Sequence, residues 1–263
     1  VPMIVGTGAI RTEDSIAFAS AANDIGADAL LIATPPYAYP TGREIALHAL
    51  AIARAANLPA MLYNYPGRMS VNMAEESSAL ASAAKDIGAD ALLIATPPYA
   101  YPTGREIALH ALAIDRAANL PAMRYHYPGR MSVNMDEETL DRLGRSPNFC
   151  AIKESSGDPN RLHLLARDYP HIQLSCGMDD QALEFFAWGA RSWVCAGSNF
   201  APEAHSALYQ ACAVEGDFTK GRAIMSAMMP LMRVLEQGGK FIQCIKYGLT
   251  LRGIDAGPPR RPL

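Results

Sequence analysis

Short apolar runs alternate with longer stretches of helical apolar spacing along most of this chain. Each short run closes on Gly, Pro or a polar residue, which is typical of buried strands in a parallel sheet. Eight runs predict strands, at residues 2–6, 29–34, 59–64, 91–96, 121–126, 149–154, 171–176 and 192–197. The stretch "TGREIALHALAIARAAN" illustrates the helices between them, with Thr41 as a predicted N-cap and Glu44 three residues later.

Eight strands, each followed by a helical pattern, predict an α/β fold of the (β/α)8 TIM barrel type over residues 1–200. The pattern after residue 200 is helical only. Residues 201–263 are therefore predicted to form a C-terminal helical region packed on the barrel.

A long internal repeat interrupts this regular picture. Residues 19–73 match residues 81–135 except at Asn23/Lys85, Ala53/Asp115, Leu62/Arg124 and Asn64/His126. Ancient repeats keep only their hydrophobic pattern, so near identity indicates a recent duplication, an engineered one or an error in the sequence. Without the two strands of the first copy, the predicted sheet would have six strands and two open edges. We therefore hypothesise that the first copy supplies two strand–helix units that allow the barrel to close.

Composition narrows the class of protein. The 263 residues are 50% hydrophobic and 19% charged, as in a globular enzyme, and the net charge of -3 argues against a nucleic-acid partner. No apolar run approaches the length that spans a membrane. The five cysteines lack C-x-x-C spacing, and three lie in strand-like runs, which predicts buried free thiols in a reducing compartment. The start "VPMIVGTG" has no initiator Met and suggests a fragment boundary.

Barrel active sites form where the strands end, so the chemistry is sought there. The sixth predicted strand places Lys153 in "CAIKESSGD". A lysine at a strand end often extends to water. The alternative is a desolvated amine of lowered pKa that attacks a ketone and forms a Schiff base.

Strands four and five end in tyrosine-rich segments. "RYHYPGR" offers Tyr125 as a proton carrier or a packed core tyrosine, and Arg130 as a solvent-exposed or carboxylate-binding cation. "TPPYAYPTG" adds Tyr99 and Tyr101 in a proline-stiffened turn. His126 is expected to pack rather than to bind a metal, because no ligand-type residue lies at suitable spacing. Cys176 and Cys195 are expected to be core thiols rather than nucleophiles.

Several ordered motifs run through nearly the whole chain: "GTG" (6–8), "GADALLIATPPYAYPT" (88–103), "LPAMRYHYPGR" (120–130), "AIKESSGD" (151–158), "LSCGMDD" (174–180) and "GARSWVCAGSNFAPE" (189–203). With them the chain resembles the dihydrodipicolinate synthase / N-acetylneuraminate lyase family of class I Schiff-base lyases and aldolases. The resemblance implies a lyase that uses pyruvate or another 2-oxo acid and an aldehyde, with no cofactor beyond a lysine Schiff base and no metal.

The resemblance also implies residue roles. Lys153 would form the Schiff base, Tyr125 would shuttle protons, and Tyr99 would be the second tyrosine of the relay. Arg130 would bind the carboxylate of a second substrate such as aspartate semialdehyde, and the substrate-binding residues Gly177 and Val194 would line the pocket. The family spacing holds only from the second copy, since the first copy's tyrosines lie too early. A cytoplasmic homo-oligomer, dimer or tetramer, serving lysine biosynthesis is expected.

The chain departs from the family pattern at its beginning. The family usually opens with two further strands and a G-T-T-G-E-type loop that binds the pyruvate carboxylate, and no such loop occurs here. Arg124 and His126 also depart from the pattern, which Leu62 and Asn64 of the first copy keep. The alternatives are therefore a catalytically impaired barrel of the same family, recombined or engineered, or a 2-oxo sugar-acid aldolase, dehydratase or deaminase.

Overall fold

The computed structural model describes residues 1–263 except 36–40, 65–80, 83, 86–87, 97–101 and 261–263. These residues form two compact units: residues 2–152, called here the first unit, and Val1 with residues 153–263, called the second unit. The strands are β1 Ile4–Gly6, β2 Ala29–Ala33, β3 Ala60–Asn64, β4 Ala91–Ala95, β5 Ala122–His126, β6 Phe149–Glu154, β7 Gln173–Cys176 and β8 Ser192–Trp193.

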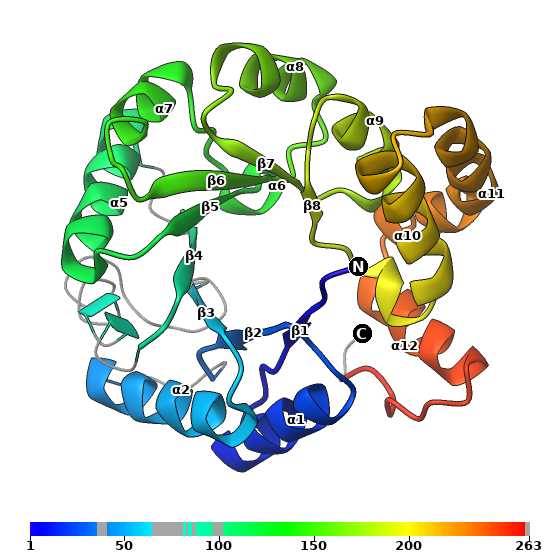
Figure 1. Ribbon diagram of the computed structural model, residues 1–263, viewed down its shortest axis with the longest axis horizontal. Coiled ribbons are helices and arrows are strands. Elements are labelled where there is room, and N and C mark those ends of the chain that lie inside the picture. The colour runs from blue at the N-terminus through cyan, green and yellow to red at the C-terminus, as the bar shows by residue number, and fades with distance from the viewer. Residues whose placement is uncertain (36–40, 65–80, 83, 86–87, 97–101, 261–263) are drawn as a thin grey trace. The chain divides into compact units, whose positions relative to one another are not determined.

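The helices follow the strands along the chain (Figure 1). In the first unit they are α1 Thr12–Asp24, α2 Gly42–Ala56, α5 Gly104–Ala118, α6 Pro128–Met131 and α7 Glu137–Leu143. In the second unit they are α8 Pro159–Asp168, η1 Asp179–Gln181, α9 Ala182–Ala187, η2 Gly197–Asn199, α10 Pro202–Tyr209, η3 Gln210–Val214, α11 Phe218–Gln237 and α12 Phe241–Leu251. None of these helices is both long and apolar enough to cross a membrane.

Each of the eight predicted runs contains a strand, and the strands follow one another in the sheet in chain order. The pairings from β1 to β5 and the pairing of β7 with β8 are parallel. The prediction for β8 was too long, since this strand ends at Trp193 instead of residue 197. The reason is that the amides of Ala196 and Gly197 donate to the side chain of Asp179 rather than to a neighbouring strand.

The same aspartate contact sets the strand register in both copies of the repeat. Asp28 Oδ2 accepts the Met3 N–H at 2.7 Å, and the Asp28 N–H donates to the Met3 carbonyl at 2.9 Å. In the second copy, Asp90 Oδ2 accepts the Ala60 N–H at 2.8 Å, and the Asp90 N–H donates to the Ala60 carbonyl at 2.9 Å. Each aspartate therefore closes a two-hydrogen-bond ring with the preceding strand at the point where its own strand begins.

The register at the junction of the two copies repeats the register within each copy. Leu30 of β2 lies opposite Ala60, and Leu92 of β4 lies opposite Ala122. At the junction, Met61 of β3 lies opposite Ala91 with the same spacing along the chain. The first copy thus places two strands, β2 and β3, between β1 and β4. That it replaces two units lost from the family pattern stays a prediction.

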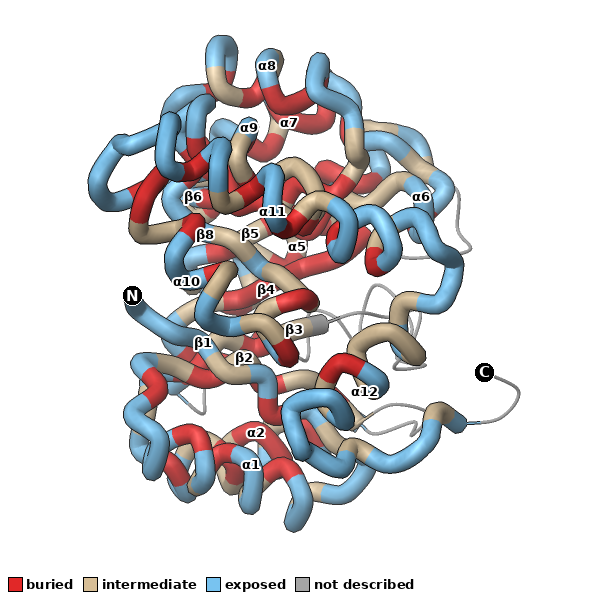
Figure 2. Tube along the Cα trace, turned by 90° about the vertical axis from the view of Figure 1, so that its right-hand side faces the viewer, coloured by how far each residue is buried: buried red, intermediate tan, exposed pale blue. Residues whose placement is uncertain are grey.

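Helices α2 and α5 begin and end in the same way because their sequences repeat. Thr41 accepts the Glu44 N–H and Glu44 accepts the Thr41 N–H, which confirms the predicted N-cap. Thr103 and Glu106 form the same capping box on α5. Asn57 and Asn119 end the two helices in the left-handed conformation. Both helices alternate buried and exposed positions along their length (Figure 2).

The second unit is mainly helical after β8. Helix α10 packs on α11, and α11 packs on α12 (Figure 1). The buried side of α11 is lined by Met225, Met228, Met232 and Leu235. The helical region predicted over residues 201–263 contains these elements, and its separation from a domain 1–200 stays a prediction.

Two of the four positions that differ between the copies, Asp115 and His126, make hydrogen bonds in the second copy. Asp115 accepts hydrogen bonds from Ser146 Oγ at 2.5 Å and Asn148 Nδ2 at 2.7 Å, which ties α5 to the segment before β6. His126 is buried, and its Nε2 accepts the Met135 N–H at 3.3 Å. These contacts involve side chains that the first copy lacks at Ala53 and Asn64.

Arg124 is the exception among these differences, because its burial is poorly compensated. The side chain is 1% exposed, and its hydrogen bond to Thr96 Oγ1 is long, at 3.4 Å. Nε and Nη1 have no hydrogen-bond partner among the described residues. Burial lowers the pKa of Arg124 to about 10. Leu62 is buried at the equivalent position of the first copy, so an apolar side chain suits this environment.

We expect R124L to raise the free energy of unfolding by about 1–4 kcal/mol, because it removes a buried, weakly paired charge and restores the residue of the first copy. Denaturant unfolding followed by circular dichroism measures this change. The matched control L62R places the same charge in the first copy and is expected to lower the free energy of unfolding. A less stable R124L would show that the guanidinium is well compensated.

Candidate active site

Lys153 lies near the carboxyl end of β6 and is half-buried, between the buried residues Ile152 and Glu154. The end of its side chain lies against Gly177, which follows β7. A Cβ built at position 177 would lie 3.1 Å from Lys153 Cε and would overlap Ser155 Oγ. Only glycine therefore leaves room at this point for both the lysine side chain and the serine hydroxyl.

The backbone of Gly177 is fixed from the β6 side. Its N–H donates to the Glu154 carbonyl at 2.9 Å, and its carbonyl accepts a hydrogen bond from Ser155 Oγ at 3.1 Å. Ser155 is 1% exposed, so its hydroxyl is not drawn away by solvent. These contacts hold Gly177 against Lys153, as expected of a residue that lines a lysine site.

Val194, the third predicted residue in the second unit, follows β8. Its N–H donates to the Cys176 carbonyl at 2.9 Å, which extends the β7–β8 pairing by one step, and its side chain is exposed. Gly177 follows Cys176 directly in the chain. The structure therefore brings together three predicted residues, Lys153, Gly177 and Val194, at the ends of β6, β7 and β8.

A buried ion pair includes Glu154, the residue that follows Lys153 in β6, and was not predicted from the sequence. Glu154 and Arg161 are 1% and 8% exposed, and Glu154 Oε2 lies 3.6 Å from Arg161 Nε. Glu154 Oε1 also accepts the Ser156 N–H at 2.6 Å. The pair connects β6 to α8 and so holds the turn that follows Lys153. Neighbouring residues of a strand point to opposite faces, so this pair and the lysine lie on different sides of β6.

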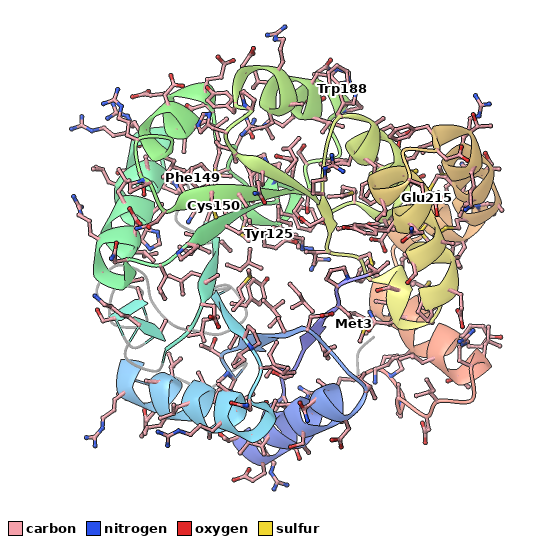
Figure 3. All side chains as sticks on the ribbon, in the orientation of Figure 1. Met3, Tyr125, Phe149, Cys150, Trp188 and Glu215 are labelled. Carbon is pink, nitrogen blue, oxygen red and sulfur yellow. The ribbon has the colours of Figure 1, made fainter. Side chains whose placement is uncertain are left out.

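In the first unit, Tyr125 and Arg130 are linked through Tyr127. Tyr125 is 8% exposed, and its ring centroid lies 5.9 Å from that of Tyr127. Arg130 Cζ lies 5.2 Å from the centre of the Tyr127 ring, in a cation–π arrangement. Figure 3 shows where Tyr125 projects from β5. Tyr127 had no predicted role, although its place between Tyr125 and Arg130 in "YHYPGR" was a usable signal.

Two parts of the predicted site stay predictions. Tyr99, the second tyrosine of the expected relay, lies outside the described residues. Tyr125 and Arg130 belong to the first unit and Lys153 to the second. The approach of Tyr125 to Lys153 is therefore still an expectation from the resemblance.

The cysteines near the site have the properties of core thiols. Burial raises the pKa of Cys176 well above its ordinary value and that of Cys195 to about 11, so neither is a thiolate at neutral pH. Cys150, also expected to be buried, is exposed in β6. Among the described residues, no three His, Cys, Asp or Glu side chains gather in a way that could hold a metal ion.

Comparison with known sequences agrees with the family resemblance of the motifs. A model of the "Dihydrodipicolinate synthetase family" matches residues 1–78 and, in a second match, residues 71–263. A 4-hydroxy-tetrahydrodipicolinate synthase of Pseudomonas aeruginosa is 38% identical over 197 residues, which are 73% of this chain and 65% of the relative. The corresponding enzyme of Exiguobacterium sibiricum is 35% identical over 67% of this chain and 60% of its own length. The match thus spans less than two thirds of either relative.

Solved structures agree on the fold. The chloride-inhibited dihydrodipicolinate synthase of Acinetobacter baumannii, complexed with pyruvate, matches with a TM-score of 0.75 and 25% identity, over 100% of this chain and 92% of that structure. A catalytic lysine mutant of Ruminococcus gnavus sialic acid aldolase matches with a TM-score of 0.77 and 20% identity, over 99% and 88%. The fold class is therefore the predicted (β/α)8 barrel with C-terminal helices.

We expect G177A to lower the free energy of unfolding by about 1–3 kcal/mol, because the new methyl group must displace Ser155 or Lys153 from a packed position. Denaturant unfolding tests this expectation. Gly6 provides a matched control, since a Cβ built there meets nothing within 4 Å. A loss in G6A as large as that in G177A would show that the contact at Gly177 is not the cause.

Proposed function

Because this chain belongs to the dihydrodipicolinate synthetase family, we propose that it is a class I lyase or aldolase that joins a 2-oxo acid to an aldehyde through a lysine Schiff base. The observation that carries the proposal is the packing of Gly177 against Lys153 at the ends of β7 and β6. Pyruvate is the proposed 2-oxo acid, and aspartate semialdehyde is the proposed partner, as in the synthases that the chain resembles.

The proposed reaction begins at Lys153. The neutral amine adds to the ketone carbon of pyruvate, and the carbinolamine then loses one water molecule to give the imine. Loss of a proton from the methyl carbon gives the enamine, whose carbon attacks the aldehyde carbonyl. Hydrolysis of the new imine consumes one water molecule, releases the product and restores the lysine. The protonated imine nitrogen accepts the electron pair when the methyl proton leaves, so this scheme includes no separate cofactor.

The other predicted residues take the roles that the scheme requires. Tyr125 and Tyr99 move the protons of imine formation, and Arg130 binds the carboxylate of the second substrate through its guanidinium. Gly177 and Val194 line the pyruvate pocket with backbone groups. The burial of Tyr125 supports its role. The role of Arg130 is supported by its cation–π contact with Tyr127, which places the exposed guanidinium near the pair of rings Tyr125 and Tyr127.

We further propose a homo-oligomer, a dimer or tetramer, that works in the cytoplasm in lysine biosynthesis. The support for this location is the absence of disulfides among the five cysteines, as expected in a reducing compartment. A barrel of the same family without turnover is the competing proposal. It is favoured by Arg124 and His126, which replace the residues that the first copy keeps.

Incubation with pyruvate followed by borohydride is expected to add one reduced pyruvate imine to Lys153, as measured by peptide mass spectrometry. K153A is expected to abolish the adduct. Labelling of other lysines to the same extent would contradict the assignment. Cooperative unfolding with no adduct in the unsubstituted chain would favour the barrel without turnover.

The repeat offers an internal control for the tyrosine relay. Y99F is expected to slow adduct formation by about 100-fold, because it removes a proton carrier, whereas Y37F removes the same hydroxyl from an identical sequence and is expected to leave the rate unchanged. The measurement is the rate of borohydride-trapped adduct at a fixed pyruvate concentration. Equal slowing in both variants would contradict the assignment of the relay to the second copy.

A further inference from the structure

Asp179 is fully enclosed at the start of the η1 turn and points toward the segment that follows β8. Its side chain is 1% exposed. Oδ2 accepts the N–H groups of Ala196 at 3.0 Å and Gly197 at 2.8 Å, and Oδ1 accepts Trp193 Nε1–H at 3.2 Å. One carboxylate therefore receives three donors from a single segment, residues 193–197, that includes the end of β8.

The donors are themselves held in place. The Trp193 ring stacks on His205 with centroids 4.9 Å apart and planes 28° apart, and it meets the edge of Phe186 at 6.0 Å. Gly197 packs closely against His205, because a Cβ built at position 197 would overlap the imidazole and lie 3.3 Å from Asp179 Oδ2. The segment thus has little freedom to move while the carboxylate is in place.

The main chain of Asp179 is held in place as well. The Asp179 N–H donates to Glu236 Oε1 of α11 at 3.2 Å. Burial raises the pKa of Asp179, and the hydrogen bonds from the two amides oppose this effect together with the charge of His205. The three donors therefore favour the ionised form of a carboxylate that burial disfavours.

This arrangement links two walls of the lysine site. Asp179 lies two residues after Gly177, which contacts Lys153, and it holds the segment that contains Val194. We propose that Asp179 is a positioning residue that fixes the backbone of residues 194–197 relative to Gly177 and Lys153, and so sets the binding of the 2-oxo acid. The inference rests on the proposed function, because it assigns the purpose of the contact to pyruvate binding.

The substitution D179N tests the proposal. The asparagine side chain has only one oxygen that can accept hydrogen bonds, and its amide N–H groups would face the N–H donors of residues 193–197. In the borohydride assay, the half-saturating pyruvate concentration is expected to rise about tenfold or more, while the trapping rate at saturating pyruvate changes less than about threefold. W193F removes one donor and keeps a ring for stacking, so we expect a smaller rise in the same direction.

The exposed Asp168, which pairs with its neighbour Arg167 in α8, supplies the charge-matched control. D168N is expected to leave both quantities unchanged. If D179N and D168N have the same half-saturating pyruvate concentration, the proposal is overturned. It is also overturned if D179N lowers only the trapping rate at saturating pyruvate. If D179N does not fold, W193F decides, and an unchanged half-saturating concentration in W193F overturns the proposal.

Hydrogen exchange separates this inference from the proposed function. The amides of Ala196 and Gly197 are expected to exchange slowly in the unsubstituted chain and at least about tenfold faster in D179N. Slow exchange in both proteins overturns the positioning role. If the unsubstituted chain forms no pyruvate adduct, the proposed function fails and the role in pyruvate binding fails with it. Faster exchange in D179N then shows that the contact fixes the backbone alone.

Discussion

The register of the parallel strands is the constraint on which the rest of the first unit depends. Asp28 fixes it at the start of β1 and β2, and Asp90 fixes it at the start of β3 and β4, each by the same pair of hydrogen bonds. Since side chains alternate between the two faces, a slip of one residue would exchange every buried side chain of a strand with its neighbours. The burial of Leu30 and Ile32 on β2 follows from the register with β1 that Asp28 fixes.

Sequence pattern was enough to predict the strands because local features specify them. Apolar runs closed by Gly or Pro locate all eight within a few residues, and the Thr41–Glu44 spacing located the start of α2. The error at β8 has a different origin. Residues 194–197 are as apolar as a strand, but the amides of Ala196 and Gly197 bind Asp179. A contact between a side chain and a distant backbone leaves no trace in local periodicity.

The candidate site was predictable where single residues carry the signal. Lys153 was identified from its place at a strand end, and Gly177 and Val194 from the resemblance to a family. The buried Glu154–Arg161 pair and the link through Tyr127 were missed, since each needs two residues to be close in space. Arg124 was recognised as unusual, yet the extent of its burial follows from tertiary packing that the sequence does not express.

The near identity of residues 19–73 and 81–135 has a consequence for how the chain folds. A strand–helix pair from either copy can dock beside β1 with almost the same contacts, so the unfolded chain can assemble two competing arrangements that differ in which copy comes first. The hydrogen bonds of Asp115 to Ser146 and Asn148 are made only when the second copy lies beside the segment before β6. A few polar contacts, rather than the hydrophobic core, therefore separate the native arrangement from its closest rival, and transient mispaired species are the natural cost of such a sequence.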